Sequence, residues 1–122
     1  MWAILLEIGA RGMRERVRRH LDHARRLADL VRADERLELV QEPELSICVF
    51  RYVAPGLDDE ALDELTARIA LRLRAEGRTI PTTTTIRGRH VLRPCFVNPR
   101  TPVELVDELA ASVCRIGDEL TA

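Results

Sequence analysis

Hydrophobic residues after Gly12 recur at intervals of three and four positions, which is the spacing of one face of an α-helix. The spacing predicts an amphipathic helix over about residues 11–33. The apolar segment Met1–Ile8 precedes it, and Gly9 and Gly12 bracket a predicted break between the two. We therefore expect residues 1–12 to form an apolar lead-in segment and residues 13–122 to form a small domain. The apolar face of the helix contains Met13, Val17, Leu21, Ala24, Leu27, Ala28 and Val31.

Two further helices carry start and stop signals. Asp58 or Asp59 is expected to cap a helix that runs to about Glu76, and Gly77 supplies a left-handed end. The run TPVE at 101–104 has a threonine at the N-cap, a proline at the first helical position and a glutamate two positions later, which predicts the start of the last helix. The apolar positions are Leu62, Leu65, Ile69 and Leu73 in the first of these helices, and Val106, Leu109, Ala110, Val113 and Ile116 in the second.

Four segments have the residue preferences of β-strands. Residues 36–40 alternate leucine with charged residues, and residues 45–53 are rich in β-branched and aromatic side chains, with Pro43 in the connection between them. Residues 79–86 and 90–97 read as the two arms of a β-hairpin.

The hairpin and the order of elements together indicate the fold class. Gly88 supplies the hairpin turn, and Pro81 and Pro94 each lack an amide donor, so the hairpin is expected to lie partly at a sheet edge. The order helix, two strands, helix, two strands, helix predicts an α+β fold. We expect a small antiparallel sheet of about four strands with helices packed on one face.

The charges are nearly balanced, and every basic residue is an arginine. The 122 residues carry 19 basic and 20 acidic side chains, for a net charge of −1, and they include no lysine. The balance favours neither nucleic acid nor an acidic membrane as a partner, and the arginines of residues 11–26 fit a solvated helix face. Met1–Ile8 is too short for a membrane span and contains Glu7. The absence of lysine excludes Schiff-base chemistry on a lysine side chain of this chain.

The cysteines and histidines do not form a recognisable metal or catalytic motif. Cys48, Cys95 and Cys114 are widely spaced among apolar neighbours, which favours reduced, buried thiols in a cytoplasmic protein. His20 and His23 lie three positions apart and could share a metal, but no third ligand is evident, so we interpret them as structural or solvent-facing. The sequence therefore predicts no metal site and no catalytic residue within this chain.

Two polar features of the hairpin are candidates for ligand contact. Thr82–Thr85 is interpreted first as a β-branched strand, and otherwise as a hydroxyl-lined wall beside a polar ligand. Arg93 shares a predicted strand face with Val91, Cys95 and Val97. An arginine among such neighbours either extends its charged end to solvent or pairs with an anion.

Five segments in sequence order resemble the small C-terminal domain of group II pyridoxal-phosphate-dependent amino-acid decarboxylases, the family of the aromatic amino-acid, glutamate and diaminobutyrate enzymes. Trp2–Arg14 is similar to the tryptophan- and glycine-containing segment that enters this domain, and His20–Ala28 is similar to the helix that follows. Leu45–Arg51 (LSICVFR) resembles the strand L-x-x-V-x-F-R. Gly77–Thr82 resembles G-x-hydrophobic-x-x-T, and Val91–Thr101 resembles the run that contains R-x-x-x-x-N-P-x-T.

The resemblance implies part of a fold-type I pyridoxal-phosphate enzyme, a carboxy-lyase of amino-acid metabolism. The lysine that holds the cofactor would lie in a large domain N-terminal to the residues seen here, so this chain alone is expected to be inactive. Within the parent enzyme, the chain would help to close the active site, and Arg93 would contact the substrate. The resemblance also implies a large-domain partner and a homodimer, and Met1–Ile8 is a candidate for self-association.

A second function remains open at this point. The chain could instead be a stand-alone interaction module that dimerises through Met1–Ile8 and the first helix and has no catalytic role. Neither the substrate amino acid nor the type of pyridoxal-phosphate chemistry follows from these residues.

Overall fold

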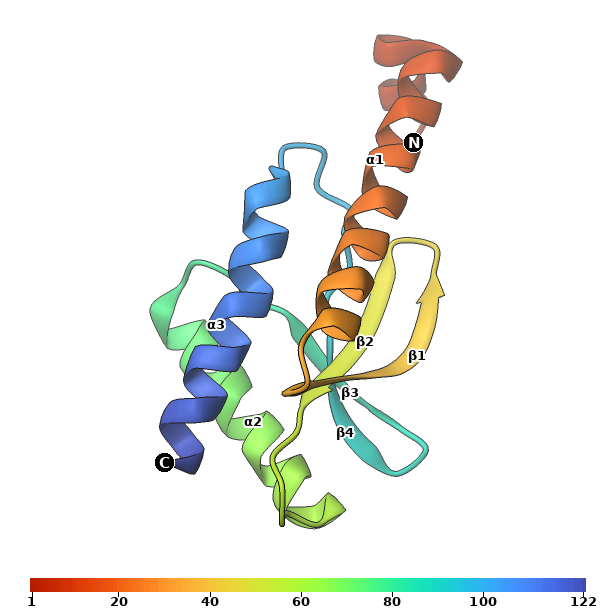
Figure 1. Ribbon diagram of the computed structural model, residues 1–122. Helices are drawn as coiled ribbons and strands as arrows, with labels where there is room; N and C mark the ends of the chain where they lie inside the picture. Colours follow the sequence, from red (N-terminus) through yellow and green to blue (C-terminus); the bar gives the residue numbers. More distant parts are fainter.

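A computed structural model describes residues 1–122 and contains three helices and one four-stranded sheet (Figure 1). The helices alternate with pairs of strands, in the order that the sequence predicts. No helix combines the length and the apolarity that a membrane crossing requires. In chain order the elements are α1 (Trp2–Ala33), β1 (Leu37–Glu44), β2 (Ile47–Tyr52), α2 (Asp59–Glu76), β3 (Thr82–Ile86), β4 (Arg89–Arg93) and α3 (Val103–Thr121).

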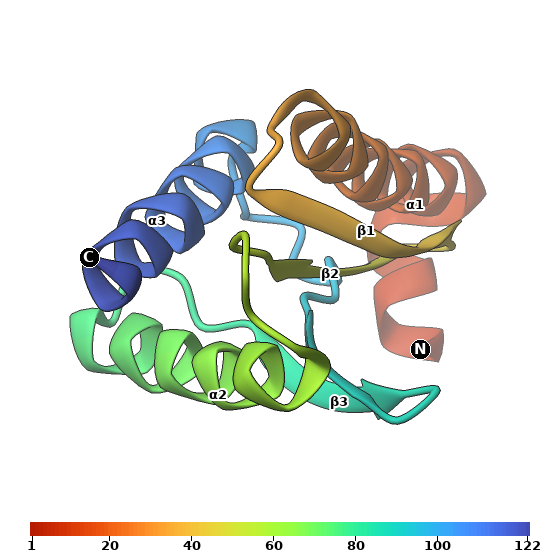
Figure 2. The same ribbon diagram turned by 60° about the horizontal axis from the view of Figure 1, so that its bottom comes forward.

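The sheet is antiparallel throughout and has the strand order β1-β2-β4-β3. The strands β1 and β3 are therefore the edges, and the two hairpins meet where β2 lies beside β4. The helix α1 packs on β1 and β2, α2 packs mainly on β4, and α3 contacts both of these helices (Figure 2). This arrangement confirms the α+β class and the antiparallel four-stranded sheet.

The first helix is longer than predicted, because the segment before Gly9 is also helical. It begins at Trp2, and a single non-helical residue, Gly9 with φ 68° and ψ 177°, interrupts it. The segment Trp2–Ile8 turns away from the axis of the following helix at this point (Figures 1 and 2). The predicted break thus lies at Gly9, and Gly12 is an ordinary helical residue.

The β3–β4 hairpin turns at Arg87 and Gly88, both of which have positive φ angles of 52° and 78°. Two consecutive residues of this kind form the turn whose twist matches that of the flanking strands. The prediction that Pro43 lies between strands is wrong, since this residue lies within β1. An edge strand tolerates proline because its outward amides have no partner in the sheet.

The caps of α2 follow the sequence signals, whereas the start of α3 does not. The Asp58 side chain accepts a hydrogen bond from the amide of Ala61 at 2.9 Å, and Gly77 ends the helix in the left-handed conformation. The expected N-cap at Thr101 is wrong, because Pro102 occupies the N-cap of α3 and no side chain caps this helix. The Thr101 amide instead donates to the carbonyl of Asn98 as part of a turn.

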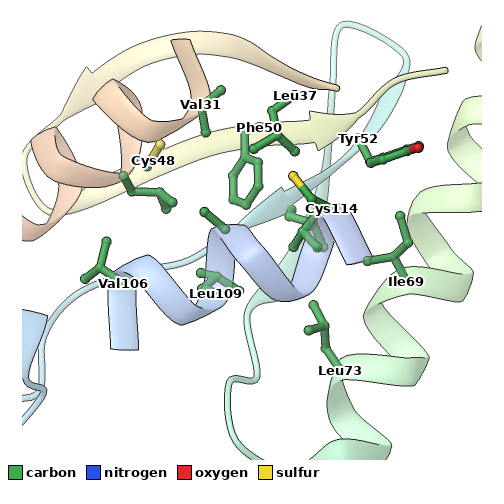
Figure 3. Close-up of a cluster of buried hydrophobic side chains, with 14 of the residues drawn as sticks. Val31, Leu37, Cys48, Phe50, Tyr52, Ile69, Leu73, Val106, Leu109 and Cys114 are labelled. Carbon is green, nitrogen blue, oxygen red and sulfur yellow. The ribbon is translucent and has the colours of Figure 1, made fainter. Parts of the chain in front are cut away.

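One hydrophobic core lies between the sheet and the three helices (Figure 3). Phe50 of β2 is fully buried in its centre, and Leu92 of β4, beside it in the sheet, is buried with it. The helix α3 approaches the sheet closely at Gly117, whose backbone lies against the ring of Tyr52. A Cβ atom at Gly117 would lie 2.3 Å from Tyr52 Cδ2, so only glycine allows this approach.

We therefore expect Gly117→Ala to lower the free energy of unfolding by roughly 1–3 kcal/mol, the range for inserting an extra methyl group into a packed interior. Alanine favours a helix over glycine by about 1 kcal/mol, but this gain cannot offset a displaced aromatic ring. Urea unfolding of the wild type and the variant measures the difference. Ser112→Ala on the same helix is the control, and a Gly117→Ala midpoint at or above that of the control would contradict the expectation.

Candidate functional site

Arg93 lies at the end of β4, on the sheet face that points away from the core. Its neighbour Leu92 points into the core, and alternation along a strand directs Arg93 to the other side. The register of β2 and β4 places Val49 opposite Arg93, and Thr82 is its partner on β3. The guanidinium therefore projects from the middle of the sheet and not from an edge.

The charge of Arg93 has no counter-charge in the structure. The side chain is half-buried, its Nε atom is buried without a hydrogen-bond partner, and no carboxylate forms an ion pair with it. A buried donor without a partner is costly, and Arg93 is half-buried with such a donor at its Nε. The predicted common face with Cys95 and Val97 does not extend that far, because β4 ends at Arg93 and Pro94 follows.

The threonine run beside Arg93 forms the edge strand β3. Thr84 is half-buried and the other three threonines are exposed, so the run is partly open to solvent. The Thr82 hydroxyl donates a hydrogen bond of 2.6 Å to the carbonyl of Arg93. This bond fixes the backbone that carries the guanidinium, which gives Thr82 a structural role next to the candidate site.

A second arginine, Arg51 of β2, is the most deeply buried charge in the molecule, with 4% of its side chain exposed. Its Nε donates to Glu38 of β1 at 2.6 Å, and its Nη2 donates to Asp59 of α2 at 3.0 Å. Oδ1 of Asp63 on α2 lies 3.9 Å from Nη1 of Arg51. The same oxygen accepts a hydrogen bond from the amide of His90 on β4 at 2.7 Å. These carboxylates neutralise the charge of Arg51, although its Nη1 is buried without a hydrogen-bond partner. We interpret Arg51 as a residue that joins the two strands to α2.

The sequence motif that ends in Arg51 was part of the family resemblance, but no role followed from it. A buried arginine in a hydrophobic strand is the only signal that the chain offers. Its partners come from other elements, which spacing along the sequence does not bring together.

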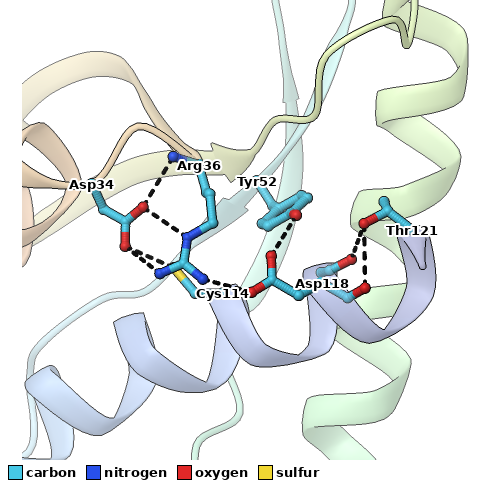
Figure 4. A network of polar contacts seen from close by, with 7 residues as sticks. Asp34, Arg36, Tyr52, Cys114, Asp118 and Thr121 are labelled. Carbon is cyan, nitrogen blue, oxygen red and sulfur yellow. Dashed lines mark hydrogen bonds and ion pairs between the residues drawn. The ribbon is translucent and has the colours of Figure 1, made fainter.

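A third polar network joins the α1–β1 connection to α3 (Figure 4). Arg36 donates to both oxygens of Asp34 and, at 2.6 Å, to Asp118, whose other oxygen accepts the hydroxyl of Tyr52 at 2.8 Å. Hydrogen bonds from Arg36 hold the pKa of Asp34 far below its usual range. Burial raises the pKa of Cys114, which lies beside Asp34, to about 12. The network lines a depression of about 590 Å³, but its charges are paired internally, and we interpret it as structural.

The histidines of α1 have no third potential metal ligand beside them. His23 is buried and packs edge-on against Phe96 with ring centroids 5.7 Å apart. His20 Nε2 and His23 Nδ1 are buried without hydrogen-bond partners, and no group of three potential metal ligands exists in the chain. The structure thus favours the structural interpretation of this pair.

The cysteines follow the prediction only in part. Cys48 and Cys114 are buried, and burial raises the pKa of Cys48 to about 12, so both thiols stay protonated. The prediction of a buried Cys95 is wrong, because this residue is exposed. Pro94 ends β4, and Cys95 contacts the sheet only through an isolated bridge to Ile47.

Comparisons with known proteins relate the whole arrangement to one class of enzyme. No family model matches the chain. The chain is 32% identical over 97 residues to L-2,4-diaminobutyrate decarboxylase of Acinetobacter baumannii, which covers 76% of the chain and 19% of that protein. It is 26% identical over 109 residues to the aromatic-L-amino-acid decarboxylase of Bacillus atrophaeus, covering 85% of the chain and 23% of that protein.

The fold is found in solved structures of the same kind. The crystal structure of Oryza sativa TDC with PLP and tryptamine superimposes with a TM-score of 0.90 at 24% identity, over 99% of this chain and 26% of that one. The chain spans about a quarter of the length of the proteins it matches. The comparisons confirm the resemblance to group II pyridoxal-phosphate decarboxylases over most of the chain.

The buried histidines generate a pH-dependence of stability. Burial, followed by nearby positive charge, lowers the pKa of both His20 and His23 in the folded chain. The unfolded chain therefore binds more protons, and the free energy of unfolding should fall as the pH drops below about 6.5. The carboxylates titrate at lower pH, so urea unfolding between about pH 7.5 and 5.5 isolates the histidines. His23→Gln should flatten the slope and His90→Gln should not, and equal slopes in all three proteins would refute this assignment.

Proposed function

We propose that this chain is the small C-terminal domain of a pyridoxal-phosphate-dependent amino-acid decarboxylase. In the assembled enzyme it helps to close the active site and to orient the substrate. The match of most of the chain to amino-acid decarboxylases, at up to 32% identity, is the observation that carries the proposal. Arg93, an unpaired guanidinium on the sheet face away from the core, supplies the matching chemistry.

The residues of this chain do not fit a covalent cofactor site. The chain contains no lysine, so no side-chain amine can bind pyridoxal phosphate as an imine. Bound in the remainder of the enzyme, the cofactor would supply the electron-accepting chemistry of decarboxylation. We assign no residue of this chain to the cofactor and expect the chain alone to be inactive.

Arg93 is proposed to bind or orient a carboxylate of the substrate. A guanidinium has a planar set of donors that can hold a carboxylate through two parallel hydrogen bonds, and these fix its orientation. A very firm grip on the departing carboxylate would stabilise the ground state and slow the reaction. We therefore propose a moderate interaction, in which Arg93 orients the substrate or braces a loop that closes over it.

The assembly is proposed to include a large cofactor-binding domain and a second copy of the enzyme. Trp2 and Leu6 in the first helical segment are 70% and 67% exposed, and Ile4 between them is also exposed. Exposed apolar side chains of this kind are typical of a protein–protein interface.

A cytoplasmic location is proposed as well, since the exposed thiol of Cys95 is free and a reducing compartment preserves such thiols.

The stand-alone interaction module is the rival to this proposal, and no structural observation favours it. The reading frame upstream of Met1 in the gene separates the two. A preceding segment with a His-x-x-Lys-like cofactor site supports the decarboxylase, and its absence supports the module.

In the assembled enzyme, we expect Arg93→Ala to lower kcat/KM by roughly 10- to 100-fold, which corresponds to the loss of a charged hydrogen bond of about 1.5–3 kcal/mol. Absorbance of the bound cofactor should remain, because the lysine that holds it lies outside this chain. Arg93→Lys should recover only part of the loss, since an ammonium group cannot copy the planar pair of donors.

Arg87→Ala in the exposed hairpin turn is the matched control for this experiment, since it also removes an arginine without an ion pair. It should leave kcat/KM unchanged. Full activity of a correctly folded Arg93→Ala enzyme would show that Arg93 only extends its charge to solvent and that its proposed role is wrong.

The isolated chain should self-associate through the segment Met1–Ile8. Replacing Ile4 and Leu6 together by serine should shift the sedimentation profile toward the monomer, because both side chains are exposed and apolar. Leu45→Ser, at an equally exposed leucine on the β1–β2 turn, is the control and should leave the profile unchanged. If the wild type is already monomeric at high micromolar concentration, this surface does not drive association.

A further inference from the structure

The arginines near the start of α1 differ from those near its end in having no acidic partners. Arg25, Arg26 and Arg32 all form ion pairs with carboxylates. The five arginines between positions 11 and 19 form none, although Glu15 lies among them. The molecule therefore carries an uncompensated positive charge at the end where the helix turns at Gly9.

Part of this charge surrounds a depression of about 300 Å³ between α1 and the loop before α3. Its charged lining consists of Arg16, Arg19, Arg100 and Glu15, so its net charge is +2. Its apolar wall is formed by Ile8 and Gly12, along with Pro99.

Hydrogen bonds hold one guanidinium of the three, that of Arg19, and the backbone of Arg100. The Nη1 of Arg19 donates to the carbonyl of Pro99 at 3.1 Å, which joins the helix to the loop and leaves its other donors free. The amide of Arg100 donates to the side chain of Asn98 at 2.9 Å, which fixes the turn that carries Arg100. The loop that carries Arg100 is therefore joined to α1 through Arg19 without any ligand.

The glycines of α1 shape the apolar wall. A Cβ atom at Gly12 would lie 2.9 Å from the Cβ of Ile8, so glycine is required for Ile8 to pack against the helix there. The positive φ of Gly9 permits the change of direction that brings the first helical segment back toward this position. The positive charge also affects His20, because Arg16 and Arg19 add to the effect of burial in lowering its pKa.

We propose that Arg16, Arg19 and Arg100 form a binding site for a phosphate dianion, either inorganic phosphate or the phosphoryl group of a phosphate monoester. Guanidinium groups pair with phosphate oxygens through planar sets of donors, and a net charge of +2 matches a dianion better than a carboxylate. This site is separate from Arg93, and the inference does not depend on the proposed decarboxylase function.

The test is a titration of the 122-residue chain with inorganic phosphate, methyl phosphate and acetate, followed by NMR of the arginine Nε–H groups. We expect saturable shifts of Arg16, Arg19 and Arg100 with both phosphates, together with a rise in the pKa of His20 as the positive field is neutralised. Weaker binding of methyl phosphate than of inorganic phosphate would identify the free ion as the ligand, and equal binding would identify the phosphoryl group in general.

Three variants distinguish a built site from diffuse attraction. Arg16→Gln and Arg19→Gln should each weaken phosphate binding about 10-fold or more, the loss expected for a charge-assisted hydrogen bond. Arg18→Gln removes the same charge from the same helix but does not line the depression, so its effect should be less than about 2-fold. Equal weakening in all three, acetate binding as tightly as phosphate, or no saturable shift in millimolar phosphate would overturn the proposal. Circular dichroism of each variant verifies that the fold is intact.

Discussion

The buried charge of Arg51 is the constraint on which the arrangement of the molecule depends. A fully buried arginine such as Arg51 requires neighbouring carboxylates, and here they come from β1 and α2. The partner Glu38 also pairs with Arg89 of β4, so one network joins three strands and a helix. The register of β1, the position of α2 and the path of β4 are therefore coupled through this network, with Arg51 at its centre.

Arg51 of the first hairpin and Arg93 of the second differ in their ion-pair partners. Both lie on inner strands, but the first is surrounded by acids and the second has none. The charge of Arg51 is neutralised by neighbouring carboxylates, whereas no carboxylate pairs with the half-buried Arg93. The same contrast occurs along α1, where the arginines near its end form ion pairs with carboxylates and those near its start do not.

Sequence patterns predicted the elements wherever the signal was local. The capping aspartate Asp58 lies three residues from the amide it binds, so the start of α2 could be read directly. The prediction of Thr101 as an N-cap was wrong, because the Thr101 amide belongs to a turn in which it donates to the carbonyl of Asn98. The sequence could not predict the exposure of Cys95, because it depends on where β4 ends. It could not predict the carboxylates around Arg51 either, because they come from distant elements that meet only in the fold. The sequence marked Arg93 as a charge in an apolar strand, whereas its lack of an ion-pair partner became visible only in the fold.

The join between β2 and β4 is narrow, since the ladder there contains the single pair Phe50 and Leu92, with one isolated bridge beyond it. Each hairpin closes a short loop, whereas this join must close a loop that contains all of α2. Loop-closure entropy therefore opposes the join more than it opposes either hairpin. We therefore expect the two hairpins to form before they join, and the joining of β2 to β4 to limit the rate of folding.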